Sequence, residues 1–209
     1  MSKPVDIKIA QFTKPENLEQ SIDSSLVFEI FQKNCNEVLK HFIKFQQTWV
    51  NQAYTVFKDF DTYLVLIYLI NKVFLNLSDR FHYMSFESFY NQERLSIDKI
   101  NLIEISKDLN IPKETIRRKV NFLQDQGIIY RDGKSIFLNV SKITIQKPVT
   151  SIGLIATCLA NFSDLLSSQK WFGDKISQET IVKFIHDHFT VSWEYFFRFQ
   201  IPYLVRHRT

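Results

Sequence analysis

The chain of 209 residues is poor in residues on which many enzymes depend. It contains 4 glycines and 2 cysteines. So few glycines argue against an enzyme built on glycine-rich ligand loops and favour a mostly helical fold. The sequence contains no GxSxG, no phosphate-binding glycine loop, no HExxH and no aspartate-rich metal loop. It therefore predicts a protein that is not an enzyme and that uses no cofactor.

The cysteines and histidines give no sign of a metal site. Cys35 and Cys158 lie far apart and form no CxxC. The N-terminus shows no secretory signal, so we expect reduced thiols in a cytoplasmic protein, with Cys35 packed on an apolar helical face. His186, Asp187 and His188 are adjacent, but residues two apart on a helix point to different faces.

Long apolar runs are also scarce. The most apolar segment, Thr62–Leu77, is interrupted at Asn71 and Lys72 and is shorter than the ~20 residues that a bilayer requires. We expect it to be a buried helix at the centre of the fold, and we expect no membrane partner.

Two helices joined by a tight turn are predicted after residue 100. A short strand is expected at Lys99, followed by a helix that Asn101 caps, with Glu104 bonding back in a capping box. Asn110 tolerates the left-handed conformation of a helix exit, and Pro112 has a fixed φ that suits the start of a second helix.

The second helix is predicted to run from Lys113 to Gln126 and to stop at Gly127. At about 100° per residue, Ile116, Val120 and Leu123 share one narrow apolar sector, and polar residues cover the opposite side. A hairpin should follow, because Asp132-Gly133 is a strong two-residue turn signal. The expected cross-strand pairs are Arg131–Lys134, Tyr130–Ser135 and Ile129–Ile136.

The segment IPKETIRRKV, residues 111–120, together with Leu123 and Gly127, resembles the recognition helix of bacterial winged helix-turn-helix transcription regulators, MarR-like in the broad sense. The resemblance implies a mainly α fold containing a winged helix-turn-helix with a short β-hairpin wing, flanked by long N- and C-terminal helices. It also implies a sequence-specific regulator that binds double-stranded DNA as a homodimer. The alternative is a winged-helix protein-interaction or replication-initiator module without repressor function.

The charge pattern agrees with DNA binding. The net charge is only +4, but cations exceed anions by three between Lys113 and Lys134, and a local patch is sufficient to neutralise phosphates. We expect helix residues facing outward to contact base edges, their flanking cations to contact phosphates, and the wing to reach the backbone or minor groove. The expected base contacts are Glu114, Thr115, Arg118 and Asn121; the phosphate contacts are Lys113, Arg117 and Lys119; the wing contacts are Arg131 and Lys134.

The flanking regions are predicted to be helical. Apolar residues recur at three-, four- and seven-residue intervals from Ser24 to Ala53, as in one long helix that packs on its own domain and on a partner subunit. Further helices are expected over Ser151–Leu166 and from Ser177, with a turn at residues 171–174. The aromatic segment from residue 191 to the C-terminus requires covering, which a subunit interface would supply.

Five aromatic residues between positions 78 and 98 have two interpretations. They either pack a short extra helix or line a pocket for a small-molecule effector. They are Phe81, Tyr83, Phe86, Phe89 and Tyr90. The predicted organisation is an arm (1–17), an N-terminal helical region (18–78), the winged helix-turn-helix (79–148) and a C-terminal helical region for dimerisation (149–209).

Overall fold

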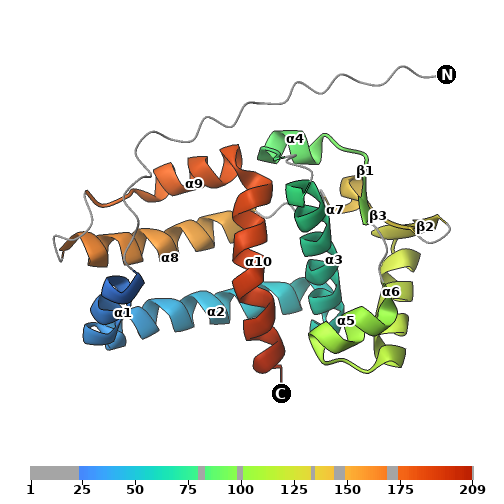
Figure 1. The fold of residues 1–209 in the computed structure, drawn as a ribbon, viewed down its shortest axis with the longest axis horizontal. Coiled ribbons are helices and arrows are strands. Elements are labelled where there is room, and N and C mark those ends of the chain that lie inside the picture. Colours follow the sequence, from blue (N-terminus) through green and yellow to red (C-terminus); the bar gives the residue numbers. More distant parts are fainter. Residues whose placement is uncertain are drawn as a thin grey trace.

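The computed structural model describes residues 24–79, 83–97, 101–132, 135–143, 149–168 and 174–208. Within these ranges the chain forms ten helices and three strands, so the predicted mainly helical fold is confirmed (Figure 1). The expected N-terminal arm lies outside the described residues. The helices are α1 (Ser24–Lys33), α2 (Cys35–Phe57), α3 (Phe60–Asp79), α4 (Phe86–Tyr90), α5 (Leu102–Leu109), α6 (Lys113–Asp125), α7 (Val140–Ile143), α8 (Val149–Ser168), α9 (Gln178–Asp187) and α10 (Phe189–Arg206); the strands are β1 (Arg94–Ile97), β2 (Ile129–Asp132) and β3 (Ser135–Asn139).

Helix α3 forms the centre of the molecule. Residues 62–69 are buried on every side of the helix, because α2, α5, α6, α10 and β1 all pack against it. Figure 1 shows α3 and α10 side by side, with α8 and α9 on one side of them and α5, α6 and the sheet on the other. The prediction of a buried central helix at Thr62–Leu77 is confirmed, and the helix extends two residues further at each end.

Helix α10 covers α3 and changes the interpretation of the aromatic C-terminal segment. Phe189, Trp193 and Phe197 recur every four residues and are buried, and the ring of Phe197 stacks on that of Phe74 in α3 with centroids 6.2 Å apart. Most of this aromatic surface is therefore covered by the chain itself, not by a subunit interface as we expected. Tyr195 and Phe199 remain exposed.

The helix predicted over Ser24–Ala53 is wrong in one respect, since it is divided at Asn34. The Asn34 side-chain amide donates to the Ile30 carbonyl oxygen at 2.8 Å, and such a side-chain bond bends a helix because it competes with the backbone. The second part, α2, continues to Phe57. Cys35, at the bend, is exposed and not packed as expected.

Helices α8 and α9 form the layer beyond α2. Their predicted positions are confirmed, and the Ser177 hydroxyl caps α9 by accepting from the Thr180 backbone N–H at 3.1 Å. By length and composition alone, α3 and α8 are each able to cross a membrane. Of their most apolar stretches, 56% of the residues in α3 are buried inside the protein but only 28% of those in α8.

The three strands form an antiparallel sheet in the order β1-β3-β2. Leu95 and Ile97 of β1 are buried and Arg94 is exposed, an alternation typical of a strand that covers a core on one face. The strand predicted at Lys99 lies outside the described residues, which resume at residue 101 after β1 ends at Ile97.

Candidate nucleic-acid interface

The turn between α5 and α6 is built by local hydrogen bonds. Asn101 Oδ1 accepts from the Ile103 backbone N–H at 2.9 Å and caps α5. Asn110 has a left-handed backbone with φ of 51°, as predicted for the helix exit. The Ser106 hydroxyl donates to the Ile111 carbonyl oxygen at 2.7 Å. The capping box is not completed as expected, because the Glu104 carboxylate accepts from Lys72 of α3 at 2.6 Å.

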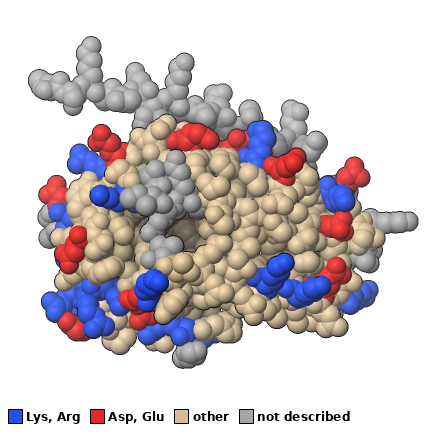
Figure 2. Space-filling view, turned by 180° about the vertical axis from the view of Figure 1, so that it is seen from behind, with Lys and Arg blue, Asp and Glu red and all other residues tan. Residues whose placement is uncertain are grey.

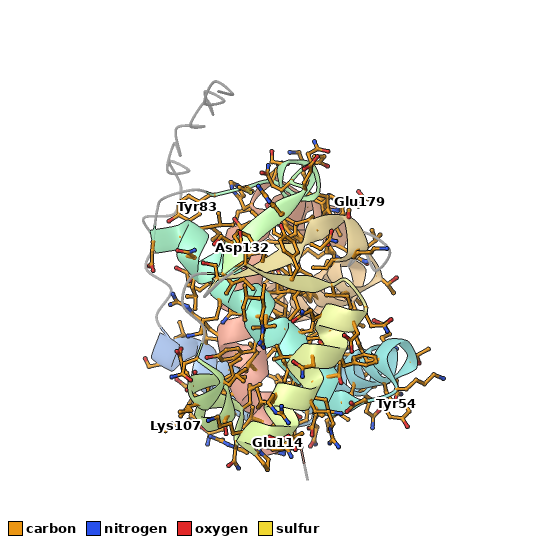
Figure 3. All side chains as sticks on the ribbon, turned by 90° about the vertical axis from the view of Figure 1, so that its right-hand side faces the viewer. Tyr54, Tyr83, Lys107, Glu114, Asp132 and Glu179 are labelled. Atoms are coloured by element: carbon orange, nitrogen blue, oxygen red, sulfur yellow. The ribbon has the colours of Figure 1, made fainter. Side chains whose placement is uncertain are left out.

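Helix α6 has the two faces that its sequence predicts. Ile116, Val120 and Leu123 are fully buried, and α6 packs on α3, α5 and β2. Lys113, Arg118 and Asn121 are exposed, and no carboxylate of the described residues forms an ion pair with Arg118. Figure 3 faces this end of the molecule, with Glu114 near the lower end of α6 and Asp132 at the sheet. The polar side of α6 is thus open to solvent, although Thr115 is half-buried.

Glu114 and Arg117 form an ion pair with each other on this polar face. Both Glu114 carboxylate oxygens accept from Arg117 Nε at 3.1 Å, and Arg117 Nη2 lies 2.5 Å from Oε1. The hydrogen bond from Arg117 holds the pKa of the Glu114 carboxyl below its usual value, against the opposing effect of desolvation. Both side chains are exposed, so the pair can open when another partner competes for either group.

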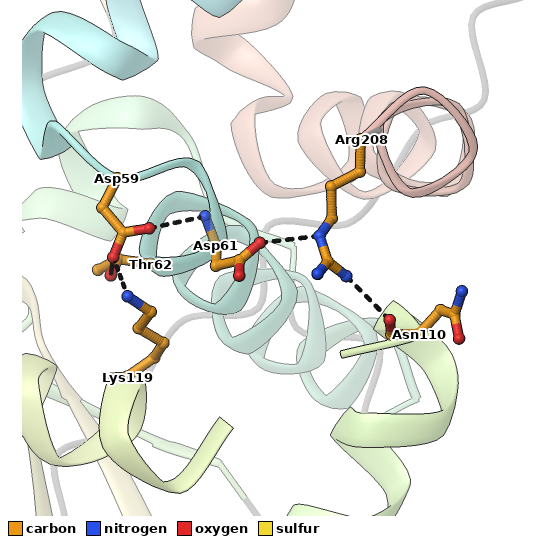
Figure 4. Close-up of polar contacts among 6 residues, drawn as sticks. All are labelled: Asp59, Asp61, Thr62, Asn110, Lys119 and Arg208. Atoms are coloured by element: carbon orange, nitrogen blue, oxygen red, sulfur yellow. Dashed lines mark hydrogen bonds and ion pairs between the residues drawn. The ribbon is translucent and has the colours of Figure 1, made fainter. Parts of the chain in front are cut away.

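Lys119, a predicted phosphate contact, does not lie on the open face. Its ammonium forms an ion pair with Asp59, and only 16% of its side chain is exposed (Figure 4). Asp59 also accepts from the Thr62 hydroxyl at 2.6 Å and from the Asp61 backbone N–H at 3.1 Å, which caps α3. Burial raises the pKa of Asp59, but the hydrogen bonds from Lys119 and Thr62 outweigh it and leave the pKa below its usual value.

The C-terminal segment reaches the same corner of the molecule. Arg208 Nε lies 2.9 Å from an Asp61 carboxylate oxygen, and Arg208 Nη1 donates to the Asn110 carbonyl oxygen at 2.8 Å (Figure 4). Arg208 therefore joins the start of α3 to the α5–α6 turn. Neither the pairing of Asp59 nor that of Arg208 was predicted from the sequence, because each partner lies far along the chain and no local motif marks it.

The hairpin is present, but its register differs from the prediction. Asp132 pairs with Ser135, so residues 133 and 134 connect the strands instead of Asp132 and Gly133. Lys134, a predicted wing contact, lies outside the described residues. Arg131 is exposed at the edge strand, β2. The observed pairs are Ile129–Leu138, Tyr130–Phe137, Arg131–Ile136 and Asp132–Ser135.

A second cation, Arg94, lies on the outer face of the same sheet. Its guanidinium is 5.9 Å from the centre of the Phe137 ring, and Phe137 stacks on Tyr130 with centroids 5.2 Å apart. Arg94 and these two rings were not predicted from the sequence, although the alternation Arg94-Leu95-Ser96-Ile97 signals β1. In Figure 2 positive and negative side chains are intermixed around the α5–α6 end, on the left of that view.

No family model, curated protein sequence or solved structure matches this chain. Among the described residues no three His, Cys, Asp or Glu side chains lie together as metal ligands. The features of this chain that bear on function are therefore the geometry of α5, α6 and the sheet.

Proposed function

We propose that the protein binds double-stranded DNA through the exposed face of α6. The observation that carries this proposal is an exposed polar face, with Lys113, Arg118 and Asn121, supported on a fully buried aliphatic face of the same helix. An α-helix fits the major groove, where Arg pairs with guanine and Asn with adenine. Arg118 and Asn121 are the base contacts we propose, and Lys113 is a phosphate contact.

We further propose that α3, α5, α6 and the sheet form a winged helix-turn-helix. The antiparallel order β1-β3-β2 and the position of β2 against α6 support this assignment. Arg131, at the exposed end of β2, would then contact the DNA backbone beside the reading helix. Arg117 becomes a phosphate contact if DNA displaces Glu114.

The biological role we propose is transcription regulation by a cytoplasmic homodimer. A single reading helix offers few base contacts, and two half-sites about 34 Å apart would double them. Exposed apolar residues on the outer helices support self-association, since large apolar side chains in solvent mark interaction surfaces. They include Leu39 and Ile43 of α2, Leu159 of α8 and Phe199 of α10.

Selection of bound sequences from a random duplex pool tests the proposal. A preferred sequence with two-fold symmetry is expected. On that sequence Arg118→Ala should weaken binding by about 1–3 kcal/mol and relax specificity at one position. Lys183→Ala is the matched control, because it removes one exposed positive charge from α9, and it should leave specificity unchanged.

One result would favour the alternative of a protein-interaction or replication-initiator module. Glu114 and Asp59 each neutralise a cation of α6, so fewer free charges face solvent than the sequence implies. If gel shifts in rising salt show no preference for any duplex over heparin, and Arg118→Ala binds as the wild type does, the assignment of α6 as a DNA-reading helix is wrong.

A further inference from the structure

Two of the five aromatic residues singled out between positions 78 and 98 belong to the core. Phe86 and Phe89 are buried and contact Phe189 of α10, and the short extra helix that they were expected to pack is present as α4. Of the other three, Tyr90 is half-buried, Tyr83 is exposed, and Phe81 lies outside the described residues. A different aromatic pair, on the sheet, is accessible to a partner.

The outer face of the sheet is open to solvent along all three strands. Side chains alternate between the two faces of a sheet, and Leu95, Ile136 and Leu138 are buried on the inner face. No outer-face residue of the described strands is buried. The outer-face residues are Arg94, Ser96, Tyr130, Asp132, Ser135, Phe137 and Asn139.

Tyr130 and Phe137 form an aromatic stack on this outer face. They lie directly opposite each other on β2 and β3, with ring centroids 5.2 Å apart and ring planes inclined by 11°. The Arg94 guanidinium lies 5.9 Å from the centre of the Phe137 ring. Because β2 is an edge strand, Tyr130 ends this row at the open edge of the sheet (Figure 1). Within the described part of the chain no second ring contacts Tyr130, so the ring of a ligand can extend the stack.

The charges around the stack favour a phosphate backbone at one end of it. Arg94 and Arg131 are exposed, and neither forms an ion pair with a carboxylate of the described residues. The strand register places Arg94 at one end of the outer face and Asp132 at the other, with the aromatic pair between them. Phosphates are therefore attracted towards Arg94 and repelled by Asp132.

We propose that the outer face of the sheet binds an unpaired stretch of a nucleic-acid strand. One base stacks on Tyr130, and the backbone crosses the sheet with its phosphates at Arg94 and Arg131. Aromatic side chains accept any base in this way, because every base has a π face. DNA and RNA share this chemistry. The outer face of the sheet is separate from the exposed face of α6, so the inference stands whether or not α6 binds duplex DNA.

Three labelled oligomers of equal length test the proposal on the full chain by fluorescence anisotropy. They are an oligothymidylate, an oligouridylate and an abasic deoxyribose-phosphate strand, which has the phosphates without the bases. At least one base-bearing strand should bind more tightly than the abasic strand, and the tighter of the two identifies DNA or RNA as the ligand. Tyr130→Leu should weaken binding of that strand about five- to tenfold and should leave the abasic strand unaffected, whereas Tyr130→Phe should bind as the wild type does. Arg94→Gln should flatten the salt slope by about 0.7, the effect of one lost phosphate contact.

Tyr195→Leu is the matched control. Tyr195 is also exposed and has an arginine, Arg198, 5.5 Å from the centre of its ring, but it lies on α10, and its replacement should leave every affinity unchanged. Far-ultraviolet circular dichroism checks that each variant is folded. The proposal is overturned if the wild type binds the abasic strand as tightly as both others, if folded Tyr130→Leu binds as the wild type does, or if Tyr130→Phe is as weak as Tyr130→Leu. It is also overturned if Arg94→Gln keeps the wild-type salt slope, or if Arg118→Ala weakens single-strand binding as much as Tyr130→Leu does, since that would place the strand on α6.

Discussion

Replacement of Lys119 by methionine distinguishes a role of Lys119 in stabilising the fold from a role in binding DNA. The substitution keeps the length of the side chain but removes the charge that Asp59 accepts. We expect Lys119→Met to destabilise the protein and to leave the salt dependence of DNA binding unchanged. Lys113→Met should do the reverse, because Lys113 is exposed on the same helix.

The expected loss of stability follows from how far the ion pair is buried. The exposed fractions are 16% for the Lys119 side chain and 35% for that of Asp59. Surface pairs contribute about 0–1 kcal/mol, and removing one partner of a fully buried pair costs about 3–5 kcal/mol. This pair lies between these limits, nearer the surface case. A loss of about 1–2 kcal/mol corresponds to a fall in Tm of about 2–8 °C for a chain of this size.

Thermal unfolding at several pH values provides the assay. The pKa of Asp59 is lower in the folded protein than its usual value, so its ionisation stabilises the fold at neutral pH. This stabilisation is lost as the pH falls through the folded-state pKa. The difference in Tm between the wild type and Lys119→Met should therefore shrink on acidification. An unchanged Tm at neutral pH, together with a salt slope of DNA binding reduced by about one, would refute the reasoning and restore Lys119 as a phosphate contact.

Two further predictions concern the fold. Gly127 has φ of +67°, and an added Cβ would meet only Lys142 Cε at 3.8 Å, so Gly127→Ala should cost about 1 kcal/mol from backbone strain alone, measurable by urea unfolding. Gln46 and Gln200 are buried and exchange two amide hydrogen bonds of 3.0 and 2.9 Å. Gln200→Leu should cost about 1–3 kcal/mol by leaving Gln46 unpaired, and the double variant Gln46→Leu/Gln200→Leu should recover part of that loss; a double variant less stable than the single one would contradict this account.

Local signals in the sequence were sufficient to place α5 and α6. Asn101, Asn110 and Gly127 act through their own side chains or their own backbone conformations, and each lies where the sequence placed it. The aliphatic face of α6 was also predictable from the sequence, because the 3.6-residue periodicity of apolar residues is a property of the helix itself. The sequence was therefore sufficient to predict which side of α6 is exposed to solvent.

Long-range pairings were not predictable in the same way. The sequence places Lys119 on the flank of α6 and Arg118 opposite the apolar sector, but nothing local indicates that Lys119 pairs with Asp59, 60 positions earlier. The hairpin register depends on which two residues form the turn. The prediction placed the turn one residue too early, at Asp132-Gly133, and therefore assigned the wrong partner in every cross-strand pair. The aromatic residues of α10 were recognised as needing cover, but nothing local indicated that α3 would supply it.

The packing of α10 on α3 also sets an order of events during synthesis. Asp79 ends α3, and α10 begins only at Phe189, so a ribosome adding about 5–20 residues per second needs roughly 5–20 s to pass from one to the other. Throughout that interval the apolar side of α3 lacks the cover that α10 supplies, and α5 and α6 are synthesised during it. A nascent chain released between Asp125 and Phe189 would carry α5 and α6 on an α3 whose apolar side is uncovered by α10, which makes such fragments targets for chaperones and proteases.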